Sequence, residues 1–143
     1  MNRINLLTLG VKNIDQSLIF YRDGLGFETT VSENSPVIVF FNNKGTKLAL
    51  YPLDELAKDI NEEEPPARSG FPGITLAYNA QSINEVDQIF ERAKQAGAKV
   101  LKHPQRVFWG GYSGYFADPD GYYWEVAYGE DWEFDENEML VIK

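Results

Sequence analysis

Hydrophobic and polar positions divide the first half of the chain into short elements. Residues 4–11 are mostly apolar, which is typical of a strand. Apolar side chains then recur at helical spacing over residues 14–24, and Asn13 can cap this predicted helix. Three further strands are predicted after it, at residues 27–32, 36–42 and 46–52.

The second half repeats this order. A predicted strand at 73–80 precedes a helix that Ser82 can cap and that ends at Gly97. The strands predicted after this helix cover residues 98–102, 112–117 and 122–128. Strand, helix and three strands therefore occur twice, at an offset of about 70 residues.

The repeat predicts an α+β fold built from two tandem βαβββ modules. We expect one domain over residues 1–143, and its parts are module one at about 1–53, a connector at 54–72, module two at about 73–129 and an acidic tail at 130–143. A short helix is possible at 53–61, and an edge strand at 139–142. Two such modules can curl one mixed sheet around a shared cavity, with the helices outside.

Strand alternation assigns the side chains of the opening strand to two sides. Leu7, Leu9 and Val11 are expected to pack under a helix. The alternate positions, Leu6, Thr8 and Gly10, then face the cavity.

Composition excludes several classes of protein. The chain is 43% hydrophobic and 14% aromatic, so it can bury a core. No apolar run reaches the roughly 18 residues of a membrane span, and the N-terminus lacks the apolar region of a signal peptide. Cysteine is absent, which excludes disulfides and thiolate sites. We expect a cytoplasmic protein that does not enter membranes.

The net charge of −9 argues against binding to nucleic acid. Residues 54–64 and residues 130–143 each contain six acids and one lysine. The rest of the chain is nearly neutral, so we interpret the acidity as a solvated surface of the connector and the tail.

The most informative motif lies at residues 114–125. Asp118-Pro119-Asp120-Gly121 predicts a tight turn between two strands. Glu125 follows as a single carboxylate in an aromatic and apolar run. A carboxylate in that position serves as a metal ligand, an acid/base group or a hydrogen-bond acceptor.

Three stretches resemble the vicinal oxygen chelate superfamily of glyoxalases, bleomycin-resistance proteins and ring-cleaving dioxygenases. They are Leu9–Asp15 with Phe20-Tyr-Arg-Asp-Gly-Leu-Gly-Phe27, Ile74–Asn79 with the helix to Gly97, and Phe116–Glu125. The resemblance covers residues 4–128 and implies the glyoxalase/bleomycin resistance/dihydroxybiphenyl dioxygenase-like fold. It identifies a fold and not a reaction. In this superfamily the modules pair within one chain or across a dimer.

The resemblance also implies four metal-ligand positions, usually His and Glu, on four strands. In this sequence they fall on Leu6, Ala49, Thr75 and Glu125. A catalytic divalent ion needs about three protein ligands, and the only histidine, His103, lies outside these positions. We therefore expect no metal site and no cofactor.

Candidate ligand contacts come from the aromatic residues. Residues 103–115 combine aromatic side chains with three glycines, which favours a mobile loop that closes over a flat or apolar ligand. The alternative is that these residues plug the cavity or form a dimer contact. The candidates from this stretch are Trp109, Tyr112, Tyr115 and, for an anionic ligand, Arg106.

Glu125 and Tyr123 are expected to face the cavity. Further candidate ligand contacts are Thr8, Tyr51 and Thr75, with Asn79 as a weak one. Glu125 is a candidate catalytic acid/base; the alternative is a former ligand position that hydrogen-bonds to Thr8, Thr75 or a tyrosine. Trp132 and Phe134 suggest that the acidic tail docks on the body or on a second subunit.

These observations predict a metal-independent protein that binds a small molecule and forms a homodimer. One alternative is a metal-free isomerase or lyase that acts on a small carbonyl compound, with Glu125 as acid/base. The other is a drug-sequestering resistance protein, as in the bleomycin-resistance members. The sequence does not name the ligand.

Overall fold

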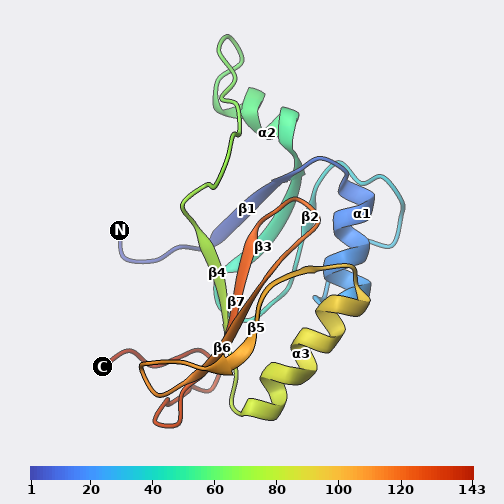
Figure 1. Cartoon of the computed structure of the whole chain (residues 1–143). Helices are drawn as coiled ribbons and strands as arrows, with labels where there is room; N and C mark the ends of the chain where they lie inside the picture. Colours follow the sequence, from blue (N-terminus) through green and yellow to red (C-terminus); the bar gives the residue numbers. More distant parts are fainter. The chain divides into compact units, whose positions relative to one another are not determined.

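The chain folds into two compact units, which a computed structural model describes over all residues 1–143. Unit 1 is Met1–Gly73 and unit 2 is Ile74–Lys143 (Figure 1). Each unit has its own sheet, with strand order β1-β3-β2 in the first and β4-β7-β6-β5 in the second. This confirms the predicted α+β class.

Unit 1 contains three strands and three helical segments. They are β1 (Leu6–Val11), α1 (Ile14–Leu18), the π-helix η1 (Ile19–Gly24), β2 (Val39–Phe40), β3 (Lys47–Pro52) and α2 (Leu53–Ile60). β1 pairs with β3 in parallel, and β2 pairs with β3 antiparallel. Asn13 caps α1 as expected, because its Oδ1 accepts a hydrogen bond from the Gln16 N–H at 3.0 Å.

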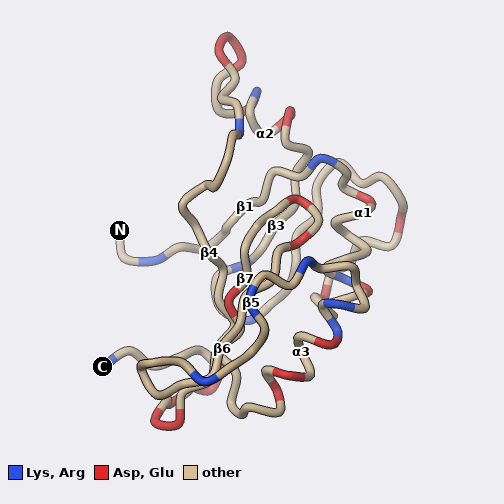
Figure 2. Tube along the Cα trace, viewed as in Figure 1, with Lys and Arg blue, Asp and Glu red and all other residues tan.

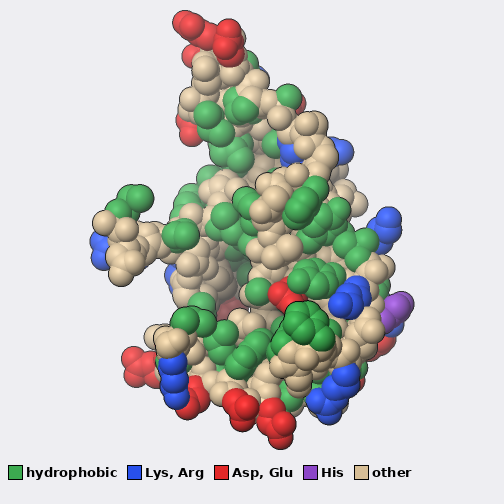
Figure 3. All heavy atoms as spheres, turned by 60° about the vertical axis from the view of Figure 1, so that its left-hand side comes forward, with side chains coloured by type: hydrophobic (Ala, Val, Ile, Leu, Met, Phe, Trp, Pro, Cys, Tyr) green, Lys and Arg blue, Asp and Glu red, His purple; other side chains and the backbone are tan.

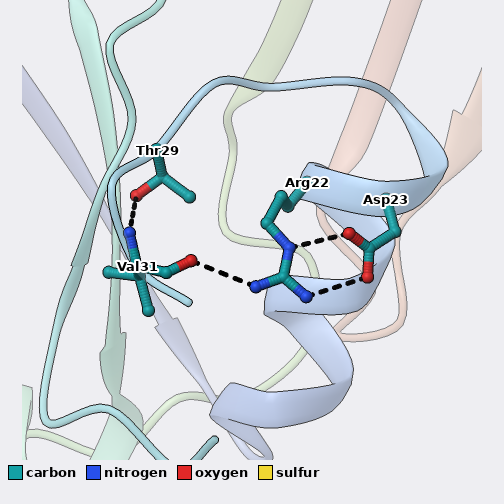
Figure 4. Close-up of polar contacts among 4 residues, drawn as sticks. All are labelled: Arg22, Asp23, Thr29 and Val31. Carbon is teal, nitrogen blue, oxygen red and sulfur yellow. Dashed lines mark hydrogen bonds and ion pairs between the residues drawn. The ribbon is translucent and has the colours of Figure 1, made fainter. Parts of the chain in front are cut away.

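The predicted strand at 27–32 is wrong, and the one at 36–42 is reduced to the two residues of β2. Polar contacts hold the segment between η1 and β2. The guanidinium of Arg22 is paired with both carboxylate oxygens of Asp23, at 2.7 and 2.9 Å, and it donates to the Val31 carbonyl at 3.1 Å (Figure 4). The Ser35 hydroxyl donates to Asp15 at 2.8 Å. These side-chain bonds fix a loop where the sequence suggested a strand.

The core of unit 1 lies between its sheet and α1 with η1. Leu9 and Val11 of β1 are buried as expected, together with Leu18, Phe20 and Tyr21 of the helical segment. On the opposite face, α2 reaches Gly10, where an added Cβ would lie 2.6 Å from Leu53 Cδ1. Gly10 therefore packs against α2 of its own unit. Only a residue without a side chain leaves room for this close approach.

Unit 2 contains a four-stranded sheet and one helix. The elements are β4 (Thr75–Asn79), α3 (Ile83–Gln95), β5 (Lys99–Arg106), β6 (Tyr112–Ala117) and β7 (Tyr123–Tyr128). β4 pairs with β7 in parallel, and the other two pairings are antiparallel. α3 buries Val86, Phe90 and Ala93. Phe90 meets Phe116 of β6 edge to face, at 5.7 Å between ring centroids, so α3 covers one face of this sheet.

The predicted mobile loop at 103–115 is wrong. β5 continues to Arg106 and β6 begins at Tyr112, so only a tight turn is left between them. This turn is closed by bonds from the Val107 N–H to the Gly111 carbonyl and from the Gly110 N–H to the Val107 carbonyl, both 3.0 Å. β5 is an edge strand, which is where a sheet tolerates Pro104.

The acidic tail forms a hairpin-like segment instead of the edge strand expected at 139–142. An isolated bridge joins Phe134 and Leu140. The Asp135 N–H donates to the Met139 carbonyl and the Val141 N–H donates to the Glu133 carbonyl, both at 2.9 Å. The tail also docks on the body of unit 2, because Trp132 stacks on Trp109.

The two acidic segments keep the exposed positions expected for them. The acids 62–64 lie at the tip of the loop that follows α2, as Figures 2 and 3 show. In the tail, Glu133, Asp135 and Glu136 are exposed. None of the helices has the length and apolar character that crossing a membrane requires.

Candidate functional site

The strand alternation of β7 divides the sheet of unit 2 into two faces. α3 packs on the face of Phe116, Trp124 and Val126. The opposite face carries Glu125 and is called the Glu125 face below. Its members are Thr75, Ala77 and Asn79 of β4, Tyr123, Glu125 and Ala127 of β7, and Ser113, Tyr115 and Ala117 of β6.

Tyr115 is the direct cross-strand partner of Glu125. Burial raises the pKa of the Tyr115 phenol, and the negative charge of Glu125 and the hydrogen bond between the two side chains raise it further. The neutral phenol therefore donates to the carboxylate. Among the roles that the sequence left open for Glu125, this geometry agrees with a hydrogen-bond acceptor that is bonded to a tyrosine.

Two more candidates lie beside this pair. Tyr123 is two residues before Glu125 on β7, and it opposes Thr75 of β4. Thr75 and Ala77 are exposed, while Tyr115, Tyr123 and Glu125 are half-buried. Asn79 of β4 also lies on this face, opposite Ala127. The structure thus brings five of the candidate residues together on one sheet face.

The structure does not bring Tyr112 or Arg106 to this face. Both belong to the α3 side, where Arg106 opposes Tyr112. The Tyr112 hydroxyl donates to Asp87 Oδ1 of α3 at 2.8 Å. This hydrogen bond is the main cause that raises the pKa of Tyr112, followed by burial and by the charge of Asp87. Tyr112 thus links the sheet to its helix.

Trp109 lies at one end of the Glu125 face. Its ring passes over Gly111, where an added Cβ would lie 1.7 Å from the ring. The ring of Trp132 passes over Gly129 in the same way, within 2.5 Å of an added Cβ. Gly111 and Gly129 continue the alternation of Ser113 and Ala127, so both rings lie on the Glu125 side of the sheet.

The two tryptophan rings stack, with centroids 5.7 Å apart and planes at 14°. Trp109 was a candidate ligand contact, but Trp132 was not. The available signal was an aromatic side chain within a strongly acidic tail. That signal predicted docking of the tail and did not say on which residue.

The remaining candidates belong to unit 1. Thr8 opposes Ala49, and Gly10 opposes Tyr51, so all four share one face of the first sheet. Thr8 and Tyr51 are half-buried, and Ala49 is fully buried. Thr8 and Tyr51 stay predictions as ligand contacts.

The side chains do not fit the His and Glu metal centre that the resemblance implies. No group of three or more His, Cys, Asp or Glu side chains is placed to hold a metal ion. His103 is exposed on the edge strand β5 and is the purple residue in Figure 3. Leu6, Ala49 and Thr75 offer no carboxylate, imidazole or thiolate to accompany Glu125.

Comparisons with known proteins agree with this fold. The model of the Glyoxalase/Bleomycin resistance protein/Dioxygenase superfamily matches residues 3–126. A metallothiol transferase FosB of Shouchella clausii is 31% identical over 135 residues, which cover 90% of this chain and 82% of that protein. The uncharacterized protein YraH of Bacillus subtilis is 29% identical over 119 residues, which cover 80% of this chain and 88% of YraH.

Solved structures show the same likeness. A glyoxalase-related enzyme from Fulvimarina pelagi superimposes with a TM-score of 0.88 at 28% identity, over 99% of both chains. A lactoylglutathione lyase from Agrobacterium tumefaciens has a TM-score of 0.67 at 27% identity, over 94% of this chain and 99% of the other.

Proposed function

Because the chain belongs to the Glyoxalase/Bleomycin resistance protein/Dioxygenase superfamily, we propose that it is a small-molecule-binding protein that works without a metal ion. The observation that carries this proposal is the Glu125–Tyr115 pair on a sheet face that α3 leaves uncovered. Glu125 is the one residue at the four family ligand positions that can ligate, and its carboxylate is engaged by a phenol.

The chemistry of this face suggests what it binds. A carboxylate accepts hydrogen bonds through two oxygens, so the N–H or O–H of a ligand can share Glu125 with the Tyr115 hydroxyl. Thr75 adds a hydroxyl, and the rings of Tyr115 and Tyr123 add apolar surface. The expected ligand therefore combines a hydrogen-bond donor with an apolar or aromatic body.

Native mass spectrometry of the protein purified from its own cells tests this proposal. We expect a small molecule to co-purify with the wild type, no metal to be retained, and the molecule to be lost in the Glu125→Gln variant. Glu91→Gln is the matched control, because Glu91 is an exposed residue of α3 paired with Lys94. Retention of one divalent ion per chain that depends on Glu125 contradicts the proposal.

A second candidate is a metal-free isomerase or lyase that acts on a small carbonyl compound. The observation in its favour is that Tyr115 lies directly opposite Glu125, because this pairing places a carboxylate beside a proton donor on an accessible face. A turnover screen of carbonyl compounds decides between the candidates. An enzyme loses at least about a hundredfold in rate on Glu125→Gln, whereas a binding protein shows no turnover in either form.

A further inference from the structure

The ring of Trp109 is held in place before any ligand arrives. It projects from the turn that joins β5 and β6, and this turn is closed by two backbone hydrogen bonds. Gly111 lies directly under the ring, at a position where any side chain would collide with it. Trp109 is nevertheless 43% exposed. An aromatic ring that is both fixed and accessible is a suitable stacking surface for a planar group.

A side chain of the same chain already uses this surface. The indole ring of Trp132 stacks on Trp109 at an angle of 14°. Trp132 follows β7 after a short turn, in which its N–H donates to the Gly129 carbonyl at 3.2 Å. Figure 1 shows the tail passing beside the β5–β6 turn. The stack therefore demonstrates, within one molecule, that the Trp109 ring accepts a flat aromatic partner.

The backbone hydrogen bonds of the tail do not depend on the contact between Trp132 and Trp109. Beyond Trp132, the tail closes its own backbone bonds between Glu133 and Val141 and between Asp135 and Met139. It adds no strand to the sheet of unit 2. Lys143 pairs with Glu133 of the tail itself, at 2.6 Å. The stack on Trp109 is therefore a contact that can exchange while the tail keeps its local structure.

We propose that the ring face of Trp109 covered by Trp132 is a binding subsite for the planar group of a ligand, and that Trp132 is its built-in occupant. A ligand with a planar aromatic group displaces Trp132 and takes its place in the stack. Gly129 and Glu125 are four residues apart on one side of the sheet, which is about 13 Å at the usual rise of a strand. A ligand of that length or less can reach both. Only the role of Glu125 in this description rests on the proposed function.

The occupant lowers the apparent affinity of the subsite. A ligand competes with Trp132 and binds only the fraction of molecules in which the stack is open. Removal of Trp132 therefore strengthens binding of a planar probe, which is the reverse of what the loss of a ligand contact does. This opposite sign separates the proposal from the simpler idea that both tryptophans line the site.

Indole is the appropriate probe, because it is the group that Trp132 presents. Titration of 15N-labelled protein with unlabelled indole is followed by NMR through the backbone N–H signals of Val107 and Gly110, which belong to the turn that carries Trp109 and are present in every variant. We expect the Trp132→Ala variant to bind indole at least threefold more tightly than the wild type. The double variant Trp109→Ala, Trp132→Ala should lose the binding.

Phe108→Ala is the control, because Phe108 is fully exposed in the same turn. It should bind indole as the wild type does. The subsite is disproved if Trp132→Ala binds indole no more tightly than the wild type, binds none, or keeps its affinity when Trp109 is also removed.

The failure of the subsite and the failure of the proposed function give different results. Indole carries no group that requires Glu125, so Glu125→Gln should leave its affinity unchanged. If the indole titration fails while a co-purified molecule still depends on Glu125, only the subsite is wrong. If indole binds as expected while no molecule depends on Glu125, the subsite stands without the proposed function.

Discussion

Asp118 shows how one residue shapes the region of the site. Its backbone N–H donates to the Tyr122 carbonyl at 2.9 Å, and its carbonyl accepts from the Gly121 N–H at 3.0 Å. Its side-chain Oδ1 accepts from the N–H groups of Asp120 and Tyr122, at 2.9 and 2.8 Å. Gly121 adopts a φ of 78°, which favours glycine. The turn predicted from the sequence therefore forms. It starts β7 in the register with β6 that places Glu125 opposite Tyr115.

Loss of the Asp118 carboxylate should destabilise the fold. Asp118→Ala leaves two N–H groups without their acceptor at a residue that is 5% exposed. We expect a loss of about 1–3 kcal/mol in the free energy of unfolding, and a smaller loss for Asp118→Asn, which keeps an acceptor oxygen. Urea denaturation measures both. Glu136→Ala, at an exposed position of the tail, is the control, and an equal effect there would refute the argument.

The Glu125–Tyr115 pair allows a second test at the scale of the residue. Glu125→Gln removes a negative charge next to the phenol, so the pKa of Tyr115 should fall towards the ordinary tyrosine value. Burial, the larger cause, stays in place, so the return should be partial. NMR titration of the labelled tyrosine ring carbons measures this pKa. A Tyr115 pKa that is identical in the wild type and in Glu125→Gln would show that the phenol and the carboxylate do not interact.

At the scale of the elements, the sequence predicted the helices and turns more accurately than the strands. α3 starts and stops where its local signals lie: Ser82 accepts from the Glu85 N–H at 3.1 Å, and Gly97 ends it with a φ of 94°. The strand predicted at 27–32 failed because that segment does not pair along one neighbouring strand. The Phe27 N–H donates to the Tyr21 carbonyl of η1, and the Val31 carbonyl accepts from the Arg22 side chain. β5 extended past residue 102 because β6 pairs with it. Strand extent depends on a partner that is distant in sequence.

The cap of α3 gives a prediction for this element. Ser82→Ala removes the acceptor of the Glu85 N–H, and we expect a cost of about 1 kcal/mol in the free energy of unfolding. Thermal and urea denaturation both report it. Gln88→Ala, on the exposed surface of the same helix, should change stability by less than about 0.5 kcal/mol. If the two variants lose the same amount, the cap is not what stabilises the start of α3.

At the scale of the molecule, three tyrosines of unit 2 should make stability depend on alkaline pH. The pKa is raised for Tyr78, Tyr112 and Tyr115. Burial is the main cause for Tyr78 and Tyr115, and the hydrogen bond to Asp87 is the main cause for Tyr112. An unfolded tyrosine ionises near pH 10. The contribution of these groups is therefore complete below about pH 10 and is lost as the pH rises through their higher folded values.

Chemical denaturation at a series of pH values tests this dependence. Ionisation of these tyrosines should not change the free energy of unfolding between pH 8 and 9, and this free energy should decline above about pH 10. The triple variant with phenylalanine at positions 78, 112 and 115 is the comparison, and it should decline less steeply. A parallel decline in both proteins would assign the pH dependence to other groups.

The oligomeric state also belongs to this scale, and a homodimer remains our proposal. Leu6 and Phe40 project from one face of the first sheet, and they are 43% and 52% exposed. Apolar side chains gathered on a sheet face suit contact with a second copy. Light scattering after size exclusion should give twice the 16.3 kDa of one chain. The variant Leu6→Ser, Phe40→Ser should shift the protein towards the monomer, with exposed Val37→Ser as the control.

The sequence by itself determined the α+β class, the order of the elements in unit 2 up to residue 128, the turn at Asp118–Gly121, the helix caps at Asn13 and Ser82, and the chemical types at the four family ligand positions. These features depend on local backbone preferences and on which atoms a side chain possesses. Only the tertiary structure decided which side chains meet. Tyr112 bonds to Asp87, 25 residues away, and Trp132 stacks on Trp109. Such contacts form because packing brings distant segments together, and neither composition nor periodicity records the partner.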